Sequence, residues 1–303
     1  MTTTNLQPTF ERTLFDWLHS QDGQIKPASR AAYLSILTTH LLSELGPLPL
    51  REITSARISS LLREKAERLS PSTVCSIAVV LRDALCFAEL RGDEVACSAS
   101  AVPHVSRSRT QDTHVLSAEE QAVFEASLRP GEPCDTGMLL ALCTGLRLGE
   151  LCGLRWSDID GDCAFLTVRR TAQRVRNPDG VGTALRFDSP KSVSSMRTIP
   201  VPARVAARLA PMRGAEDSYV LSGTARAVEP RTMQNRFKAA LRAAGLEPRN
   251  FHTLRHTFAT RWMEKGFDAK TLSRVLGHAD VSTTLSIYVH PSLETMRGYM
   301  DQM

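Results

Sequence analysis

The stretch NFHTLRHTFATRW, residues 250–262, combines an apolar helical stripe with four cationic or titratable side chains. The stripe is formed by residues at helical spacing: Phe251, Leu254, Phe258 and Trp262. His252 and Arg255 are three residues apart and fall together on the neighbouring face, beside the small Ala259. A guanidinium presents a planar fork of donors that suits phosphate oxygens, so this face is a candidate phosphate site. A solvated polar face is the alternative, and His256, further round the helix, is interpreted as structural.

A second stretch, LCTGLRLGELCGLRWSDID, residues 142–160, predicts a helix that is interrupted at Thr144-Gly145 and restarts near Arg147. The N-terminus of a helix has unpaired N–H groups and positive potential, which favour an anion. Glu150, three residues on, is placed to hold the Arg147 side chain. An ordinary exposed arginine is the alternative.

The segment SPKSVSSMRTIPV, residues 189–201, lies where the sequence predicts two strands joined by a turn. Lys191 is then at the tip of a β-hairpin. An ammonium group at such a tip can reach into a DNA groove and donate a proton to a leaving oxygen. A solvated lysine in a surface turn is the alternative.

The last motif, VLGHADVSTTLSIYVH, residues 275–290, has His278 directly after Gly277 and Tyr288 ten residues later. A phenol is a poor nucleophile at its usual pKa of about 10. Cationic neighbours would have to favour its ionised form. A tyrosine that only packs is the alternative.

Length and composition describe an ordinary globular protein. The chain has 303 residues, 42% hydrophobic and 23% charged, which suggests about two domains. No apolar run reaches the length of about 18 residues that spans a membrane, and the N-terminus lacks the pattern of a signal peptide. The seven cysteines form no CxxC pair, so we expect reduced thiols, no zinc site and a cytoplasmic location.

Charge and periodicity divide the chain. Residues 1–100 carry a net charge of −1 and residues 101–303 carry +6, a modest basic excess that fits a nucleic-acid partner. Helical patterns fill residues 9–95, whereas residues 98–112 have no apolar period. We therefore expect a helical domain over 1–100, a linker over 101–112 and a mixed domain over 113–303. A long surface loop within one domain is the alternative to the linker.

Taken in order, the segments TGLRLGEL, PKSVSSMRTIP, HTLRH, LGHADVSTT and IYVH resemble the motifs of the tyrosine recombinase (phage integrase) family. The resemblance covers the second domain. It extends to the first, where the helical segments resemble the family's core-binding domain. It implies a mainly α fold with a small β-sheet: an N-terminal helical, SAM-like, DNA-binding domain followed by an α+β catalytic domain.

The resemblance also implies an enzyme mechanism. Tyr288 would attack the scissile phosphate to form a 3′-phosphotyrosyl bond and release a 5′-hydroxyl. His252 would assist proton transfer at the nucleophile, and Lys191 would protonate the leaving oxygen.

In the same mechanism, Arg147 and Arg255 would clamp the non-bridging oxygens while His278 adds a further donor. Glu150 would support the site from behind the clamp. Positioned cations would stabilise the five-coordinate phosphorus, so no metal, ATP or other cofactor is expected.

The family implies double-stranded DNA as partner and a homotetramer acting on two duplexes, with an accessory directionality factor as a further candidate partner. Helical patterning begins by about residue 9, which leaves no room for an extra arm-binding domain and favours an Xer-like or minimal recombinase. The long stretch before Lys191 and the spacing from His278 to Tyr288 favour a mobile-element integrase instead. Integration or excision of a mobile element is the first expectation and Xer-like dimer resolution the second. A type IB topoisomerase and a non-catalytic DNA-binding protein are the remaining alternatives.

Overall fold

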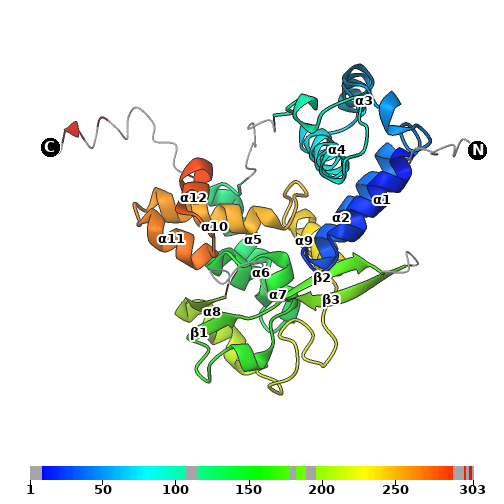
Figure 1. Ribbon diagram of the computed structural model, residues 1–303. Coiled ribbons are helices and arrows are strands. Elements are labelled where there is room, and N and C mark those ends of the chain that lie inside the picture. The colour runs from blue at the N-terminus through cyan, green and yellow to red at the C-terminus, as the bar shows by residue number, and fades with distance from the viewer. Residues whose placement is uncertain are drawn as a thin grey trace, which may run out of the picture. The chain divides into compact units, whose positions relative to one another are not determined.

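The computed structural model describes residues 9–106, 115–177, 182–188, 196–288, 297 and 300–301. The chain divides into two compact units (Figure 1). The first unit consists of residues 1–111 with 175–182, and the second of residues 112–174 with 183–303. Helices dominate both units and β-structure is limited to short strands, as the sequence predicts.

The first unit is a helical bundle built around one long helix. Its helices are α1 (Phe10–Ser20), α2 (Pro27–Ile36), α3 (Ser55–Arg68) and α4 (Pro71–Arg91). Helix α4 packs against the other three and buries one apolar face, including Leu81 and Leu85. Ser70 caps its N-terminus, and Gly92 ends it in the left-handed conformation that a glycine adopts without strain.

The second helix of this bundle is shorter than its periodicity predicts. The apolar pattern suggests a helix that continues to residue 45, but α2 ends at Ile36 and passes into a π-helical turn, Leu37–Leu41. This wider turn places both Leu37 and Leu41 in the core, each with no exposed surface.

The second unit packs its helices around α6 and α10. Its helices are α5 (Ala118–Ser127), α6 (Pro133–Thr144), α7 (Leu148–Cys152), α8 (Ala203–Leu209), α9 (Pro230–Ala243), α10 (His252–Glu264), α11 (Ala269–Leu276) and α12 (Val281–Tyr288). Ser117 and Glu120 form a capping box at the start of α5, the arrangement that a serine followed three residues later by a glutamate favours. Helix α10 packs against α6 on one side and against α11 and α12 on another (Figure 1). The predicted break at Thr144-Gly145 is present, because α6 ends there with Gly145 at a φ of +69°.

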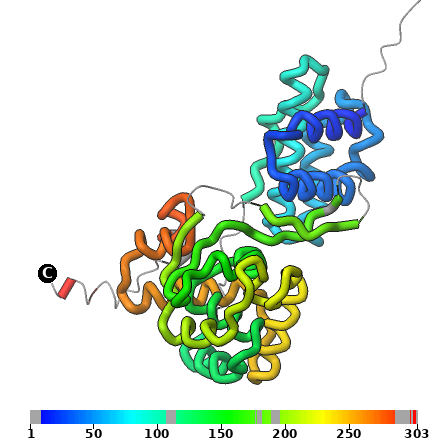
Figure 2. Tube along the Cα trace, turned by 90° about the horizontal axis from the view of Figure 1, so that it is seen from below, coloured from blue at the N-terminus to red at the C-terminus, as the bar shows by residue number. Residues whose placement is uncertain are grey.

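The strands pair differently from the prediction. They are β1 (Phe165–Val168), β2 (Thr171–Arg176), β3 (Thr183–Asp188) and β4 (Arg197–Pro200). Strand β1 pairs antiparallel with β4, so that Leu166 lies opposite Ile199, and β2 pairs with β3 in a separate ribbon that is visible in Figures 1 and 2.

The predicted hairpin of β3 with β4 is therefore wrong. Leu166 and Ile199 are at most 1% exposed and join the core, whereas no residue of β3 is buried and Leu185 packs only partly against the core. The apolar faces thus select β1 as the partner of β4. Lys191, expected at the tip of that hairpin, lies outside the described residues.

Within the part of the chain that the structure describes, no helix is long and apolar enough to cross a membrane.

Candidate active site around the end of helix α11

Arg147 lies at the junction between α6 and α7. Its backbone N–H donates to Glu150 Oε2 at 2.9 Å and its Nη1 donates to Glu150 Oε1 at 2.8 Å. Its Nη2 reaches the carbonyl of Gly277 at 3.5 Å. About a third of the Arg147 side chain, 36%, stays exposed, so the guanidinium is fixed by Glu150 and still accessible to solvent.

Arg255 is buried, contrary to the expectation of an open face shared with His252. It is 2% exposed and donates to the carbonyls of Gly145 at 2.8 Å and Leu276 at 2.9 Å. The reason is tertiary: α6 and α11 both pack on α10 and cover the face that carries Arg255. The guanidinium thus links α10, which carries it, to the C-terminal ends of α6 and α11.

His278 follows α11 and contacts Arg255 directly. Its Nε2 lies 2.8 Å from Arg255 Nη2, and its Nδ1 lies 2.8 Å from Thr284 Oγ1 on α12. Because a guanidinium can only donate, Nε2 accepts and Nδ1 carries the proton that is donated to Thr284. Burial and the positive charges of Arg255, Arg147 and Arg197 lower the pKa of His278 to about 4, so the ring is neutral near pH 7.

His252 is the first residue of α10 and an exposed one. The pKa of His252 is nevertheless lowered to about 4. The largest cause is partial desolvation of the ring by neighbouring atoms, and the charges of His256, Arg255 and Arg147 add to it. The His252 and His256 rings pack edge to face with their centroids 4.6 Å apart. A neutral imidazole at this position is able to accept a proton.

Glu150 forms a buried ion pair with Arg197, a residue that the sequence analysis did not identify as part of the site. Arg197 Nη1 donates to Glu150 Oε1 at 3.0 Å and Nη2 donates to Oε2 at 2.9 Å, with both side chains at most 6% exposed. Burial raises the pKa of Glu150, but hydrogen bonds and charge from Arg197, then from Arg147, outweigh it and hold the value at about 2. A signal was available: Arg197 shares the inward phase of β4 with Ile199, and an arginine in that phase requires a buried partner.

The structure therefore brings five of the seven candidate residues together: Arg147, Glu150, His252, Arg255 and His278. Tyr288 is the last residue of α12, which packs against α10 and α11, but its side chain lies outside the described residues, as does all of Lys191. With the histidines neutral, the arginine cluster of Arg147, Arg197 and Arg255 contains a single carboxylate, Glu150, which pairs with Arg147 and Arg197, so the site keeps an excess of positive charge. Among the described residues, no His, Cys, Asp and Glu side chains gather in a way that could hold a metal ion.

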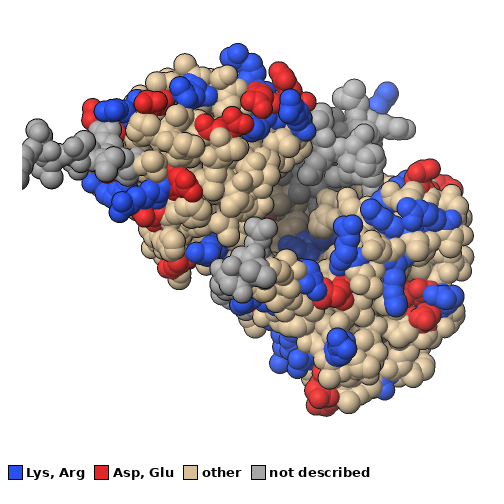
Figure 3. All heavy atoms as spheres, turned by 90° about the vertical axis from the view of Figure 1, so that its right-hand side faces the viewer, with Lys and Arg blue, Asp and Glu red and all other residues tan. Residues whose placement is uncertain are grey.

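Basic side chains also gather on the surface of the second unit. In Figure 3, blue Lys and Arg atoms are more prominent than red Asp and Glu atoms on the visible face of the lower body, which is the second unit. This agrees with the net charge of +6 over residues 101–303. Such a surface attracts a polyanion.

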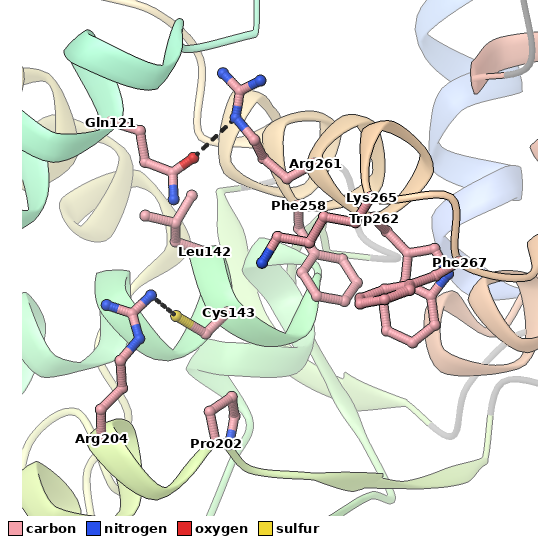
Figure 4. A pocket seen from close by; sticks show the side chains of 10 residues that line it. All are labelled: Gln121, Leu142, Cys143, Pro202, Arg204, Phe258, Arg261, Trp262, Lys265 and Phe267. Atoms are coloured by element: carbon pink, nitrogen blue, oxygen red, sulfur yellow. Dashed lines mark hydrogen bonds between the residues drawn. The ribbon is translucent and has the colours of Figure 1, made fainter. Parts of the chain in front are cut away.

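A cavity of about 350 Å³ lies beside α10, and its lining does not include Arg147, Arg197 or Arg255 (Figure 4). Phe258, Trp262 and Phe267 form its apolar wall, with the Phe258 and Phe267 rings 5.8 and 5.3 Å from Trp262. Arg204 and Lys265 lie on its border. The cavity thus combines an apolar wall with the positive charges of Arg204 and Lys265.

The sequence profile of the phage integrase family matches residues 118–294, more than half of the chain and nearly all of the second unit. The chain belongs to the phage integrase (tyrosine recombinase) family. The matched range contains every residue of the arginine cluster, together with Lys191 and Tyr288.

Named relatives in this family include Xer proteins. The tyrosine recombinase XerC-like protein of Caldanaerobacter subterraneus subsp. tengcongensis is 34% identical over 200 residues, which cover 59% of this chain but only 51%, about half, of that protein. The tyrosine recombinase XerC of Erythrobacter litoralis is 31% identical over 235 residues, which cover 73% of this chain and 69% of that protein.

Integrases are also similar in fold. A structure of the Tn1549 transposon integrase in complex with a circular intermediate DNA has a TM-score of 0.79 at 21% identity, over 98% of this chain and 99% of that chain. A structure of a lambda integrase tetramer bound to a Holliday junction has a TM-score of 0.68 at 21% identity, over 92% of this chain and 78% of that chain. This family therefore accounts for the helical fold and its short strands.

Proposed function

We propose that the protein is a site-specific DNA recombinase that cleaves and rejoins DNA through a 3′-phosphotyrosyl intermediate. The observation that carries the proposal is the convergence of Arg147, Arg255 and His278 at the end of α11, next to the helix that ends at Tyr288. Cationic donors fixed by the protein before a phosphate arrives are the arrangement that phosphoryl transfer requires.

In the first step, the Tyr288 oxygen attacks the scissile phosphorus and the bond to the 5′-oxygen breaks. His252 is neutral near pH 7 because its pKa is about 4; a bound anionic phosphate would oppose the positive charges that lower this pKa, and the ring would then accept the phenolic proton. Lys191 would give a proton to the leaving 5′-oxygen. Because the phosphotyrosyl ester keeps the phosphodiester's bond energy, a 5′-hydroxyl from another strand can reverse the step without ATP or a metal ion.

The partly exposed Arg147 and the buried Arg255 would stabilise the negative charge that develops on the non-bridging oxygens. Before DNA arrives, His278 Nε2 accepts a hydrogen bond from Arg255. An anionic phosphate opposes the cationic charges that lower the pKa of His278 and so favours the protonated ring. Protonation would turn Nε2 from an acceptor into a donor toward the phosphate.

DNA would be held by both parts of the chain. We assign residues 1–100 to a helical core-binding domain, residues 101–112 to a linker and residues 113–303 to the catalytic domain. The basic face in Figure 3 supports contacts between the catalytic domain and the phosphate backbone. Chromosomal or plasmid DNA as substrate places the protein in the cytoplasm.

Exchange between two duplexes would need four protomers. The C-terminal segment, residues 292–303 with the sequence SLETMRGYMDQM, has apolar residues at helical spacing and a net charge of −1 from two acidic residues and one arginine. The cavity in Figure 4 offers an apolar wall and positive charge of matching character. We assign the cavity of one protomer as the docking surface for this segment of a second copy.

Two biological roles fit this chemistry. Integration or excision of a mobile element is favoured by the near-complete overlap in fold with a transposon integrase and by the long segment between β1 and Lys191. Resolution of chromosome or plasmid dimers is favoured by the Xer relatives. A mobile-element role would add an accessory directionality factor as a partner, whereas dimer resolution would require a recombining site on the host's own DNA.

The proposal is tested by incubating the full chain with a library of nicked DNA duplexes and sequencing the covalent adducts. We expect one enriched, roughly palindromic sequence and loss of all adducts in Tyr288→Phe. Adducts spread over unrelated sequences would instead indicate a type IB topoisomerase. Sequence-specific binding in gel shifts without any adduct would indicate a non-catalytic DNA-binding protein.

A further inference from the structure

We propose that Arg197 is a positioning residue. It orients Arg147 through Glu150, and it holds the turn before His278 through the C-terminal end of α11. The inference rests on the proposed recombinase function, because it assigns Arg197 a role in the rate of the cleavage step. Arg197 belongs to β4 and was not among the residues that the sequence motifs indicated.

The C-terminal end of α11 is the point where the arginines meet. Three consecutive carbonyl groups each accept a hydrogen bond from a different arginine: that of Val275 from Arg197 Nε at 2.5 Å, that of Leu276 from Arg255 Nη2 at 2.9 Å, and that of Gly277 from Arg147 Nη2 at 3.5 Å. The last carbonyls of a helix lack partners within the helix and form the negative end of its dipole. One helix end thus sets the positions of three guanidiniums immediately before His278.

Arg197 also binds the carboxylate that holds Arg147. Its fork binds both oxygens of Glu150, and Glu150 Oε1 also accepts from Arg147 Nη1 at 2.8 Å. Glu150 therefore bridges two arginines, the buried Arg197 and the partly exposed Arg147. Fixing the carboxylate by two parallel hydrogen bonds fixes the direction in which Arg147 points.

The surroundings leave Arg197 little freedom to move. Its side chain is 6% exposed, and a methyl group placed on Gly277 would lie 3.0 Å from its Cδ and Nη1. All three guanidinium nitrogens of Arg197 bind either the Val275 carbonyl or Glu150, so it acts on the reaction through these two groups.

The test compares single-turnover cleavage by the full chain on the nicked duplex that the wild-type protein selects. In Arg197→Met we expect cleavage to slow by about 100-fold, the cost of a small displacement of catalytic groups, with duplex affinity in gel shifts close to wild type. Arg197→Lys should also cleave slowly, because a lysine cannot bind both Glu150 oxygens and the Val275 carbonyl. Arg170→Met is the matched control, since Arg170 likewise binds a buried carboxylate, Asp158, and a carbonyl, that of Gly153 at 3.2 Å.

A purely structural role is separated by the double variant Arg197→Met with Glu150→Gln. Removing the buried carboxylate as well should restore thermal stability, but it should not restore the cleavage rate. Full recovery of the rate in this double variant, or cleavage by Arg197→Lys as fast as wild type, would overturn the inference while leaving the recombinase proposal intact. A wild-type protein that forms no adduct would overturn both.

Discussion

Replacing Gly277 by alanine is expected to damage the active site more than the fold. Gly277 adopts a φ of +65°, where an alanine costs roughly 1–2 kcal/mol of folding free energy. In the second unit, each kcal/mol lowers the melting temperature by about 2–4 °C. The conformational penalty alone therefore predicts a decrease of about 2–8 °C.

The added methyl group also meets Arg197. Its Cβ would lie 3.0 Å from Arg197 Cδ and Nη1 and 3.2 Å from Cζ. Relaxed contacts between such atoms begin near 3.5 Å, so the arginine must move by about half an ångström. Such a shift lengthens its hydrogen bonds to Glu150, now 3.0 and 2.9 Å. Because misplacement by about 1 Å can slow an enzyme by about 100-fold, we expect cleavage to slow by about 10-fold.

Gly266→Ala provides the control for this experiment. Gly266 follows α10 with a φ of +72°, and a methyl group there would meet nothing within 4 Å. It should therefore lower the melting temperature by a similar amount while leaving single-turnover cleavage unchanged. Thermal unfolding and adduct formation, measured on both variants, separate the two effects. Equal cleavage rates in the two variants would refute the reasoning that contact between residue 277 and Arg197 controls the site.

Three further predictions concern the site and the assembly. Arg147→Ala or Arg255→Ala should slow cleavage by roughly 100-fold or more, as the loss of a transition-state donor usually does; near wild-type rates in either variant would contradict the phosphate clamp. The pKa of His278 is lowered from 6.5 to about 4 on folding, so the folded protein binds fewer protons and its stability falls as the pH drops from 6.5 to 4. Denaturation curves of His278→Asn should show a weaker pH dependence across that window, and an unchanged dependence would assign it to other groups. Deleting residues 292–303 should weaken assembly of higher-order complexes more than binding to a single site, and gel-shift titrations in which both decline equally would refute the docking of this segment on a second copy.

The sequence by itself determined the local structure. Helical periodicity located the helices of both units, and Ser117 with Glu120 marked the start of α5. The contact between Arg147 and Glu150 was also foreseeable, because residues three apart at a helix start are neighbours whatever surrounds them. Motif order was sufficient to indicate the family before any geometry was known.

Only the tertiary structure decided which strands pair and how the arginines are held. The pairing of β1 with β4 depends on which apolar faces reach the core, and adjacency in sequence favoured the wrong partner. The contacts of Arg147 with Gly277, Arg255 with Gly145 and Arg197 with Glu150 span 130, 110 and 47 residues. No local period encodes such separations, because the hydrogen bonds form only after α6, α10, α11 and β4 have packed and brought the helix-end carbonyls within reach of each guanidinium.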